Sequence, residues 1–163
     1  MTDTPSGQAT KPIRHADILI IGGGLSGTML AAQLLRLPGK RQALVIEPRA
    51  ELGRGEAYSA VELGHTLNGN AARMSVDPDN ADDLTQWLTK HIATGGWPES
   101  DQQHVPVSEL FPPRGLFGVY VQQRLAEAQA VGERHGSTVE HVRAEVVDLQ
   151  TGDDSVQLTL SDG

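Results

Sequence analysis

The sequence has no cysteine, few aromatic residues and no long apolar run, and each absence excludes a class of function. Without cysteine, the 163-residue chain cannot form disulfides, bind metals through thiolates, perform dithiol redox chemistry or use a cysteine nucleophile. Any redox function must therefore come from a cofactor. Aromatic residues make up only 4% of the chain, so its core must consist mainly of Leu, Val, Ile and Ala.

Basic clusters and membrane segments are also missing. The net charge is -8 and the 13 lysines and arginines are scattered, which argues against nucleic-acid binding. No apolar run approaches the roughly 18 residues that span a bilayer, and residues 1–15 lack the apolar segment of a secretory signal. We therefore expect a cytoplasmic protein with no membrane or nucleic-acid partner, preceded by a disordered lead-in at residues 1–15.

One stretch organises the rest of the chain. We expect a strand over residues 13–21, whose last residues after Asp17 are Ile and Leu without alternation, as is typical of a central parallel strand covered by helices on both faces. Glycines follow, and apolar residues resume at helical spacing over residues 25–37, where Pro38-Gly39 ends the helix. A strand over residues 43–47 completes a βαβ unit. The helix buries one of two faces: Leu25, Met29, Ala32 and Leu35, or Leu30, Leu34 and Leu37.

The glycines form Gly22-x-Gly24-x-x-Gly27, the dinucleotide-binding fingerprint. Gly22 permits the tight turn, Gly24 lets the backbone approach a diphosphate, and Gly27 lets the helix lie close to the strand. Free N–H groups of the first helical turn attract the anion, and Ser26 can add a hydroxyl donor. The same glycines could form a merely structural turn, but the flanking strand and helix favour a nucleotide site.

Glu47 lies twenty residues after Gly27, at the end of the second strand. A carboxylate there can accept hydrogen bonds from the two hydroxyls of an adenosine ribose, although strand-end carboxylates are often simply solvated. It would repel a 2′-phosphate, so the site is expected to hold FAD or NAD and not NADP.

The remaining pattern predicts helices over about 81–92 and 116–135, strands over 138–142 and 144–150, and a hairpin to a strand at 156–160. Residues 77–80 are expected to cap the first of these helices. Trp87 and the stripe at Phe117, Tyr120 and Val121 are interpreted as core rather than as a cofactor platform. Arg54, in a glycine-flanked loop, could face a phosphate or water. The six histidines lack metal-ligand spacing, so no metal site is predicted.

Several segments together resemble bacterial FAD/NAD(P)-binding proteins, which are related to flavin monooxygenases and to glutathione-reductase-like folds. The similarity covers residues 16–163. It rests on the following segments: residues 18–27, Glu47-Pro48, Leu52–Tyr58, Leu67–Asn70 with Arg73–Ser75, and Pro113–Tyr120.

The resemblance implies an α/β, Rossmann-like FAD-binding domain with a β-meander and a mainly helical and loop insertion at about residues 51–135. It implies FAD in the first site, with NAD(P)H as a reductant of the full-length protein. The implied FAD-binding residues are Gly22, Gly24, Leu25, Ser26 and Gly27 for the diphosphate, Glu47 and Pro48 near the ribose, Arg54 near the phosphate or ribityl chain, and Val146 for adenine. Residues 68–75 and 114–120 would approach the flavin.

The expected function is the FAD-binding portion of an NAD(P)H- and FAD-dependent oxidoreductase or monooxygenase. The alternatives are a nucleotide-binding module with a structural or sensory flavin, and an NAD-dependent dehydrogenase. Only about three parallel strands precede the end of the chain, fewer than such a sheet normally has. We therefore expect this chain to be the front part of a longer protein. By itself, the chain is expected to be inactive and to bind FAD poorly. No Ser-His-Asp arrangement can be argued, and the substrate is not specified.

Overall fold

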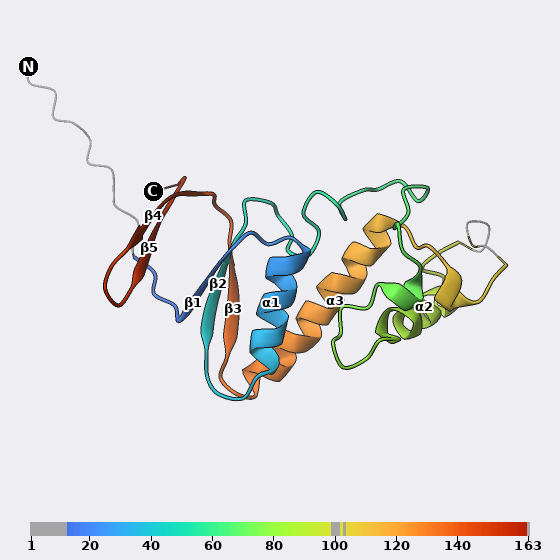
Figure 1. The fold of residues 1–163 in the computed structure, drawn as a ribbon, viewed down its shortest axis with the longest axis horizontal. Helices are drawn as coiled ribbons and strands as arrows, with labels where there is room; N and C mark the ends of the chain where they lie inside the picture. The colour runs from blue at the N-terminus through green and yellow to red at the C-terminus, as the bar shows by residue number, and fades with distance from the viewer. Residues whose placement is uncertain (1–12, 99–101, 103, 163) are drawn as a thin grey trace, which may run out of the picture.

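A three-stranded parallel sheet and two helices form the part of the chain that carries the glycine motif (Figure 1). The structure, a computed structural model, describes residues 13–98, 102 and 104–162; most of the expected lead-in lies outside these residues. The elements are β1 (Ile18–Ile21), α1 (Leu25–Arg36), β2 (Gln42–Ile46), η1 (Ala71–Arg73), α2 (Asp83–Ala93), η3 (Val107–Glu109), α3 (Arg114–Glu133), β3 (Thr138–Val142), β4 (Val146–Thr151) and β5 (Val156–Leu160).

The strand order in the parallel sheet is β1-β2-β3, with Ile20 opposite Val45 and Val45 opposite His141. The expectation that the first strand is central was therefore wrong for the described residues, because β2 lies in the middle and β1 at an edge. The strand is also shorter than expected, since pairing starts at Ile18. Only Ile20 of this strand is buried and Ile21 is 56% exposed, so the apolar run indicated neither the burial of the strand nor its place in the sheet.

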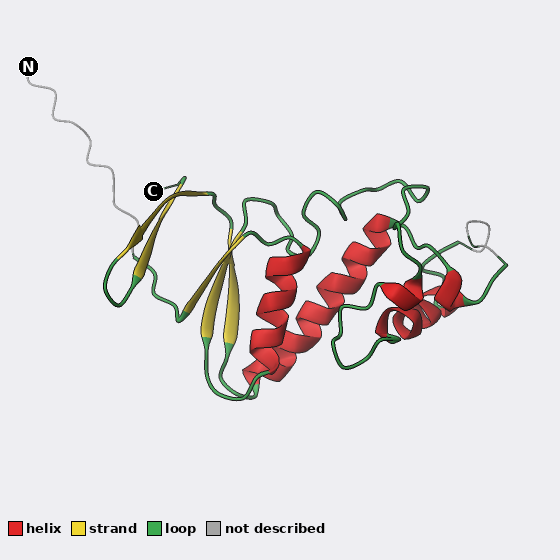
Figure 2. Cartoon of the chain, viewed as in Figure 1, coloured by secondary structure: helices red, strands yellow, loops and turns green. Residues whose placement is uncertain are grey.

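Helices α1 and α3 lie on one side of this sheet (Figures 1 and 2). Of the two faces expected for α1, the one with Ala32 and Leu35 is buried, whereas Leu30 and Leu37 are about half exposed. A side chain at Gly132 of α3 would collide with Leu35, so the two helices pack closely at this point. Their shared core contains Ile20, Ala31, Ala32, Leu35, Val45, Leu125 and Ala128.

Helix α3 also belongs to a second core, which it shares with α2 and the loops on the far side from the sheet. Phe117, Tyr120 and Val121 are at most 1% exposed and Trp87 is 6% exposed, which confirms their interpretation as core residues. Because the first half of α3 packs in this core and Leu125 packs in the sheet core, one continuous helix joins the two parts of the molecule.

Helix α2 begins slightly later than expected. Its N-cap is Asp82, which makes no capping hydrogen bond through its side chain. The expected capping residues form a turn of their own instead: Asp77 accepts from the Asp79 N–H at 2.9 Å, and Asn80 accepts from the Asp82 N–H at 3.2 Å. The polar run was thus correctly predicted as a turn and wrongly predicted as a helix cap.

The end of the chain has the predicted topology. β3 pairs parallel with β2, and β4 and β5 form an antiparallel hairpin, which Figure 1 shows across the sheet from α1 and α3. Between β2 and β3, the described residues form helices and loops, apart from one isolated bridge between Thr66 and Pro113. Across all the residues that the structure describes, no helix combines the length and apolar character needed to cross a bilayer.

Candidate nucleotide-binding site

The carboxyl ends of the three parallel strands meet at one edge of the sheet. The Gly22 N–H, just after β1, donates to the carbonyl of Ile46 at 2.9 Å, and the Glu47 N–H, just after β2, donates to the carbonyl of Val142 at 3.0 Å. The end of β2 is therefore bonded to both neighbouring strand ends, through the carbonyl of Ile46 and the N–H of Glu47, which places Glu47 beside the glycine turn. In open α/β sheets this edge is where ligands bind.

The three fingerprint glycines differ in what the protein's own structure requires of them. Gly22 has φ +96°, a conformation that L side chains rarely adopt. A Cβ on Gly27 would lie 1.9 Å from the carbonyl oxygen of Gly22, so the helix could not lie this close to the strand. A Cβ on Gly24, by contrast, would meet nothing nearer than the Cα of Gly55 at 3.9 Å. Backbone conformation thus explains Gly22 and close packing explains Gly27, whereas the protein's own contacts do not require glycine at position 24.

The first turn of α1 is open to an anion. Gly24 is the N-cap residue and provides no side-chain cap, and the turn carries no acidic residue. Ser26 in the same turn is exposed. Free N–H groups and the positive end of the helix dipole make such a terminus favourable for phosphate. The Thr28 hydroxyl donates to the carbonyl of Gly23 at 2.9 Å and so ties the turn to the helix from its buried side.

Glu47 is only 4% exposed, and its carboxylate is oriented by the turn itself. Oε2 accepts from the Gly23 N–H at 2.9 Å, while Oε1 accepts from the Arg49 N–H at 3.0 Å and from the Arg49 guanidinium at 3.2 Å. Burial raises the pKa of Glu47, but the hydrogen bonds from Arg49 and Gly23 outweigh it and hold the pKa below its ordinary value. The carboxylate is therefore charged at neutral pH.

This lowered pKa predicts a pH dependence of folding. The stabilisation from ionised Glu47 is complete above the unfolded-state pKa of about 4.3 and is lost as the pH falls through the lower folded-state value. We expect the free energy of unfolding of the wild type to approach that of Glu47→Gln as the pH falls from 6 towards 3. Urea unfolding of both proteins at several pH values measures this, and a difference that stayed constant with pH would contradict it.

A second loop lies on the glycine turn. The Gly53 N–H donates to the carbonyl of Gly23 at 2.8 Å, and Gly53 has φ +88°. Arg54 forms an ion pair with Glu51 at 2.8 Å and donates to the carbonyls of Tyr58 and Gly115, each at 3.3 Å. Arg54 therefore ties this loop to the first turn of α3, a role that the sequence did not indicate.

Residues 65–71 run along the segment that precedes α3. The Leu67 N–H donates to the carbonyl of Pro112, and the Ala71 N–H donates to the carbonyl of Leu110, both at 2.9 Å. Between these two bonds, the buried Oδ1 of Asn70 accepts no hydrogen bond from the described residues. The irregular segment is thus fixed in place and carries one unused acceptor.

The other predicted site residues lie in three different places. Leu25 is half-buried in the first turn of α1, and Pro48 is exposed directly after Glu47. Val146 lies opposite Leu160 at the start of the hairpin, where the register of the two strands shifts. The described residues contain no group of three or more histidine, aspartate or glutamate side chains that could hold a metal ion.

Sequence reasoning missed three participants. The Gly23 N–H donates to the Glu47 carboxylate, and a side chain at position 23 would place its Cβ 2.7 Å from the Glu47 Cβ. Arg49 contacts the same carboxylate and also pairs with Glu56. Gly55 makes the close approach to Gly24. The second glycine pair, Gly53-x-Gly55, was a signal that could have indicated a tight contact with the first.

Comparisons with known proteins identify a family and similar folds. A family model described as FAD-NAD(P)-binding matches residues 19–163. A flavin monooxygenase from Stenotrophomonas maltophilia is 19% identical, with a TM-score of 0.52 over 91% of this chain and 34% of its own. The ornithine N-hydroxylase of Kutzneria sp. 744 is 17% identical, with a TM-score of 0.55 over 91% of this chain and 33% of its own. These two likenesses show the fold, and the chain spans about one third of each enzyme. No curated protein sequence matches it.

Proposed function

Because the chain belongs to the FAD-NAD(P)-binding family, we propose that the carboxyl edge of its sheet holds the ADP half of FAD. The first turn of α1, from Gly24 to Gly27, binds the diphosphate through its N–H groups, with Leu25 and Ser26 in that turn. Glu47 accepts hydrogen bonds from the adenosine ribose, with Pro48 beside it. Val146 is proposed to recognise adenine through its backbone.

One observation carries this proposal: of the three fingerprint glycines, only Gly24, at the uncapped helix terminus, has neither a positive φ nor a Cβ position that clashes. Gly24 has an ordinary negative φ of -68°, and a Cβ there would make only an ordinary contact with the Cα of Gly55, at 3.9 Å. A merely structural turn has no need of glycine there. A diphosphate that lies against the backbone would require glycine there. The ribose contact is supported by the position of Glu47 at the same edge and by its lowered pKa, which keeps the carboxylate charged.

The flavin end is proposed to extend towards the loop around Arg54, residues 68–75 and the start of α3. The free Oδ1 of Asn70 supports this direction, because a buried acceptor without a donor is favoured to meet one on a ligand. Ribityl hydroxyls and the flavin N3–H are donors of that kind. Arg54 contributes by holding the loop over the turn.

The whole protein is proposed to be an NAD(P)H- and FAD-dependent oxidoreductase or monooxygenase, of which residues 16–163 are the FAD-binding part. The flavin supplies the redox chemistry when bound, and the chain supplies its position and electrostatic surroundings. Tight binding of flavin that NAD(P)H fails to reduce would favour a structural or sensory role instead.

Glu47→Gln tests the ribose contact. A charge-assisted hydrogen bond contributes roughly 1.5–3 kcal/mol, so the substitution should weaken the binding of both ADP and FAD about tenfold to hundredfold, as measured by calorimetry. Glu140→Gln is the matched control, because Glu140 is an exposed carboxylate opposite Leu44 in the middle of its strand. Equal affinities in the wild type and Glu47→Gln would show that Glu47 does not bind the ribose.

A further inference from the structure

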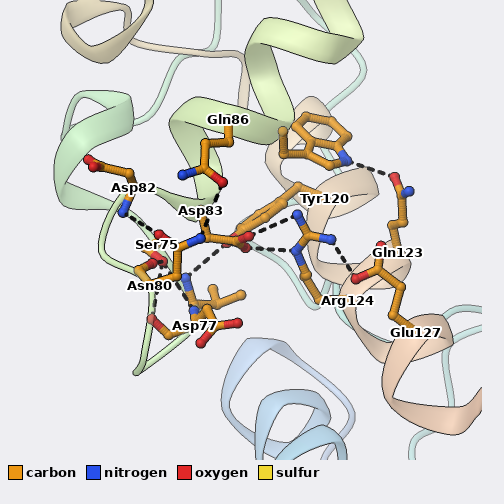
Figure 3. Close-up of polar contacts among 12 residues, drawn as sticks. Ser75, Asp77, Asn80, Asp82, Asp83, Gln86, Tyr120, Gln123, Arg124 and Glu127 are labelled. Atoms are coloured by element: carbon orange, nitrogen blue, oxygen red, sulfur yellow. Dashed lines mark hydrogen bonds and ion pairs between the residues drawn. The ribbon is translucent and has the colours of Figure 1, made fainter. Parts of the chain in front are cut away.

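A buried polar cluster outside the nucleotide site joins α2 to α3 (Figure 3). The hydroxyl of Tyr120 donates to Oδ2 of Asp83 at 2.6 Å. Arg124 donates to both oxygens of the same carboxylate, from Nε at 2.7 Å and from Nη2 at 3.0 Å. Tyr120 is fully buried and Asp83 is 8% exposed, so these bonds are shielded from water and have one well-defined geometry.

The cluster reaches a loop as well as two helices. The hydroxyl oxygen of Tyr120 accepts from the Val76 N–H at 3.1 Å. Burial and the bond to Asp83 raise the pKa of Tyr120 to about 12, so the hydroxyl keeps its proton and donates in one fixed direction. Its lone pairs are thereby aimed at the backbone of residue 76, because the donated proton sets the rotation of the hydroxyl.

The segment that ends at Val76 is fixed at its other end too. The bonds from Leu67 to Pro112 and from Ala71 to Leu110 hold its beginning against the residues before α3. Next to Val76, the Ser75 hydroxyl donates to the carbonyl of Asn80 at 2.7 Å and closes the following turn. Between the two anchors lie Asn68, Ala72 and Arg73, whose side chains are exposed. The segment is therefore held against the residues before α3 at one end and bonded to α3 through Tyr120 at the other.

We propose that Tyr120, oriented by Asp83 and Arg124, is a positioning residue that sets residues 68–76 against the flavin end of the bound cofactor. The inference rests on the proposed function, because it takes the flavin to extend towards this segment. In this proposal the second core does more than pack helices: through Tyr120 it fixes the position of residues 68–76 relative to α3, and so relative to the cofactor. Tyr120 itself does not contact the cofactor.

Tyr120→Phe tests the inference, because it removes the bond to Val76 while Arg124 still neutralises Asp83. One net hydrogen bond corresponds to about a threefold to tenfold change in affinity. In the whole gene product we expect FAD to bind about threefold to tenfold more weakly, ADP to bind within about twofold of wild type, and the visible spectrum of the bound flavin to shift. ADP contacts only the glycine turn and Glu47 in this proposal. A loss of affinity for FAD that is larger than the loss for ADP therefore comes from the flavin end.

Gln123→Ala is the matched control. It removes another hydrogen bond between α2 and α3, from Trp87 to Gln123 at 2.7 Å, without touching residue 76. The control should leave both affinities and the flavin spectrum unchanged. Equal effects of Tyr120→Phe on FAD and ADP, no effect on either, or the same FAD effect in the control would overturn the inference. A wild type that binds neither ligand would overturn the proposed function itself.

Discussion

Gly24→Val is expected to weaken FAD binding at least about a hundredfold, equivalent to about 2.7 kcal/mol, without unfolding the protein. The methyl groups of valine would project into the space that the diphosphate is proposed to fill and would separate it from the N–H groups of α1. The fold should tolerate them, because Gly24 has φ -68° and a Cβ there would meet only the Cα of Gly55 at 3.9 Å. Fluorescence titration with FAD gives the affinity.

The control is the free energy of unfolding of the same variant. We expect it to stay within about 1 kcal/mol of wild type, as for other substitutions that avoid clashes. Loss of FAD binding together with a large loss of stability would leave the steric explanation unsupported, because an unfolded turn binds nothing. Unchanged affinity would show that the turn at Gly24 is only structural.

Gly27→Ala should have the opposite profile, with a large loss of stability. Helix propensity alone predicts that Ala in place of Gly stabilises a helix by about 1 kcal/mol. The structure predicts the reverse, since the new Cβ would lie 1.9 Å from the carbonyl oxygen of Gly22 and 3.2 Å from Ile20 Cγ2. Forcing the strand and helix apart should cost about 3 kcal/mol or more, at the upper end of overpacked sites.

Urea unfolding measures this prediction, with Ser26→Ala as the control. Ser26 is exposed in the same turn, so its replacement should change stability by about 0.5 kcal/mol or less. If Gly27→Ala were as stable as wild type, the close strand–helix contact would not exist in solution. Together, the two glycine substitutions separate binding from folding within a single four-residue stretch.

The sequence predicted the elements of the fold well where a pattern had a single physical cause. The period of α3 identified Phe117 and Tyr120 as core residues, because an amphipathic stripe must face an apolar neighbour. The place of β1 in the sheet was not predictable, because strand order depends on pairings between segments distant in sequence. The predicted cap of α2 was wrong for a local reason: the side chains of Asp77 and Asn80 can accept from backbone N–H groups of a turn as readily as from those of a helix.

The candidate site was predictable only in part. The fingerprint glycines and Glu47 have fixed spacing along one βαβ unit, so the sequence could bring them together. The partners that orient Glu47 and the loop that covers the turn depend on tertiary contacts. Nothing in the sequence shows that Arg54 bonds to the carbonyl of Gly115, sixty-one residues away, or that Tyr120 accepts from the Val76 N–H.

The central claim is that this edge of the sheet holds FAD, and the visible absorption of the purified whole gene product tests it most directly. Flavin bands from about one FAD per chain, present on purification or gained on adding FAD, and absent from Gly24→Val, are the predicted result. A colourless protein that also fails to take up added FAD would contradict the account.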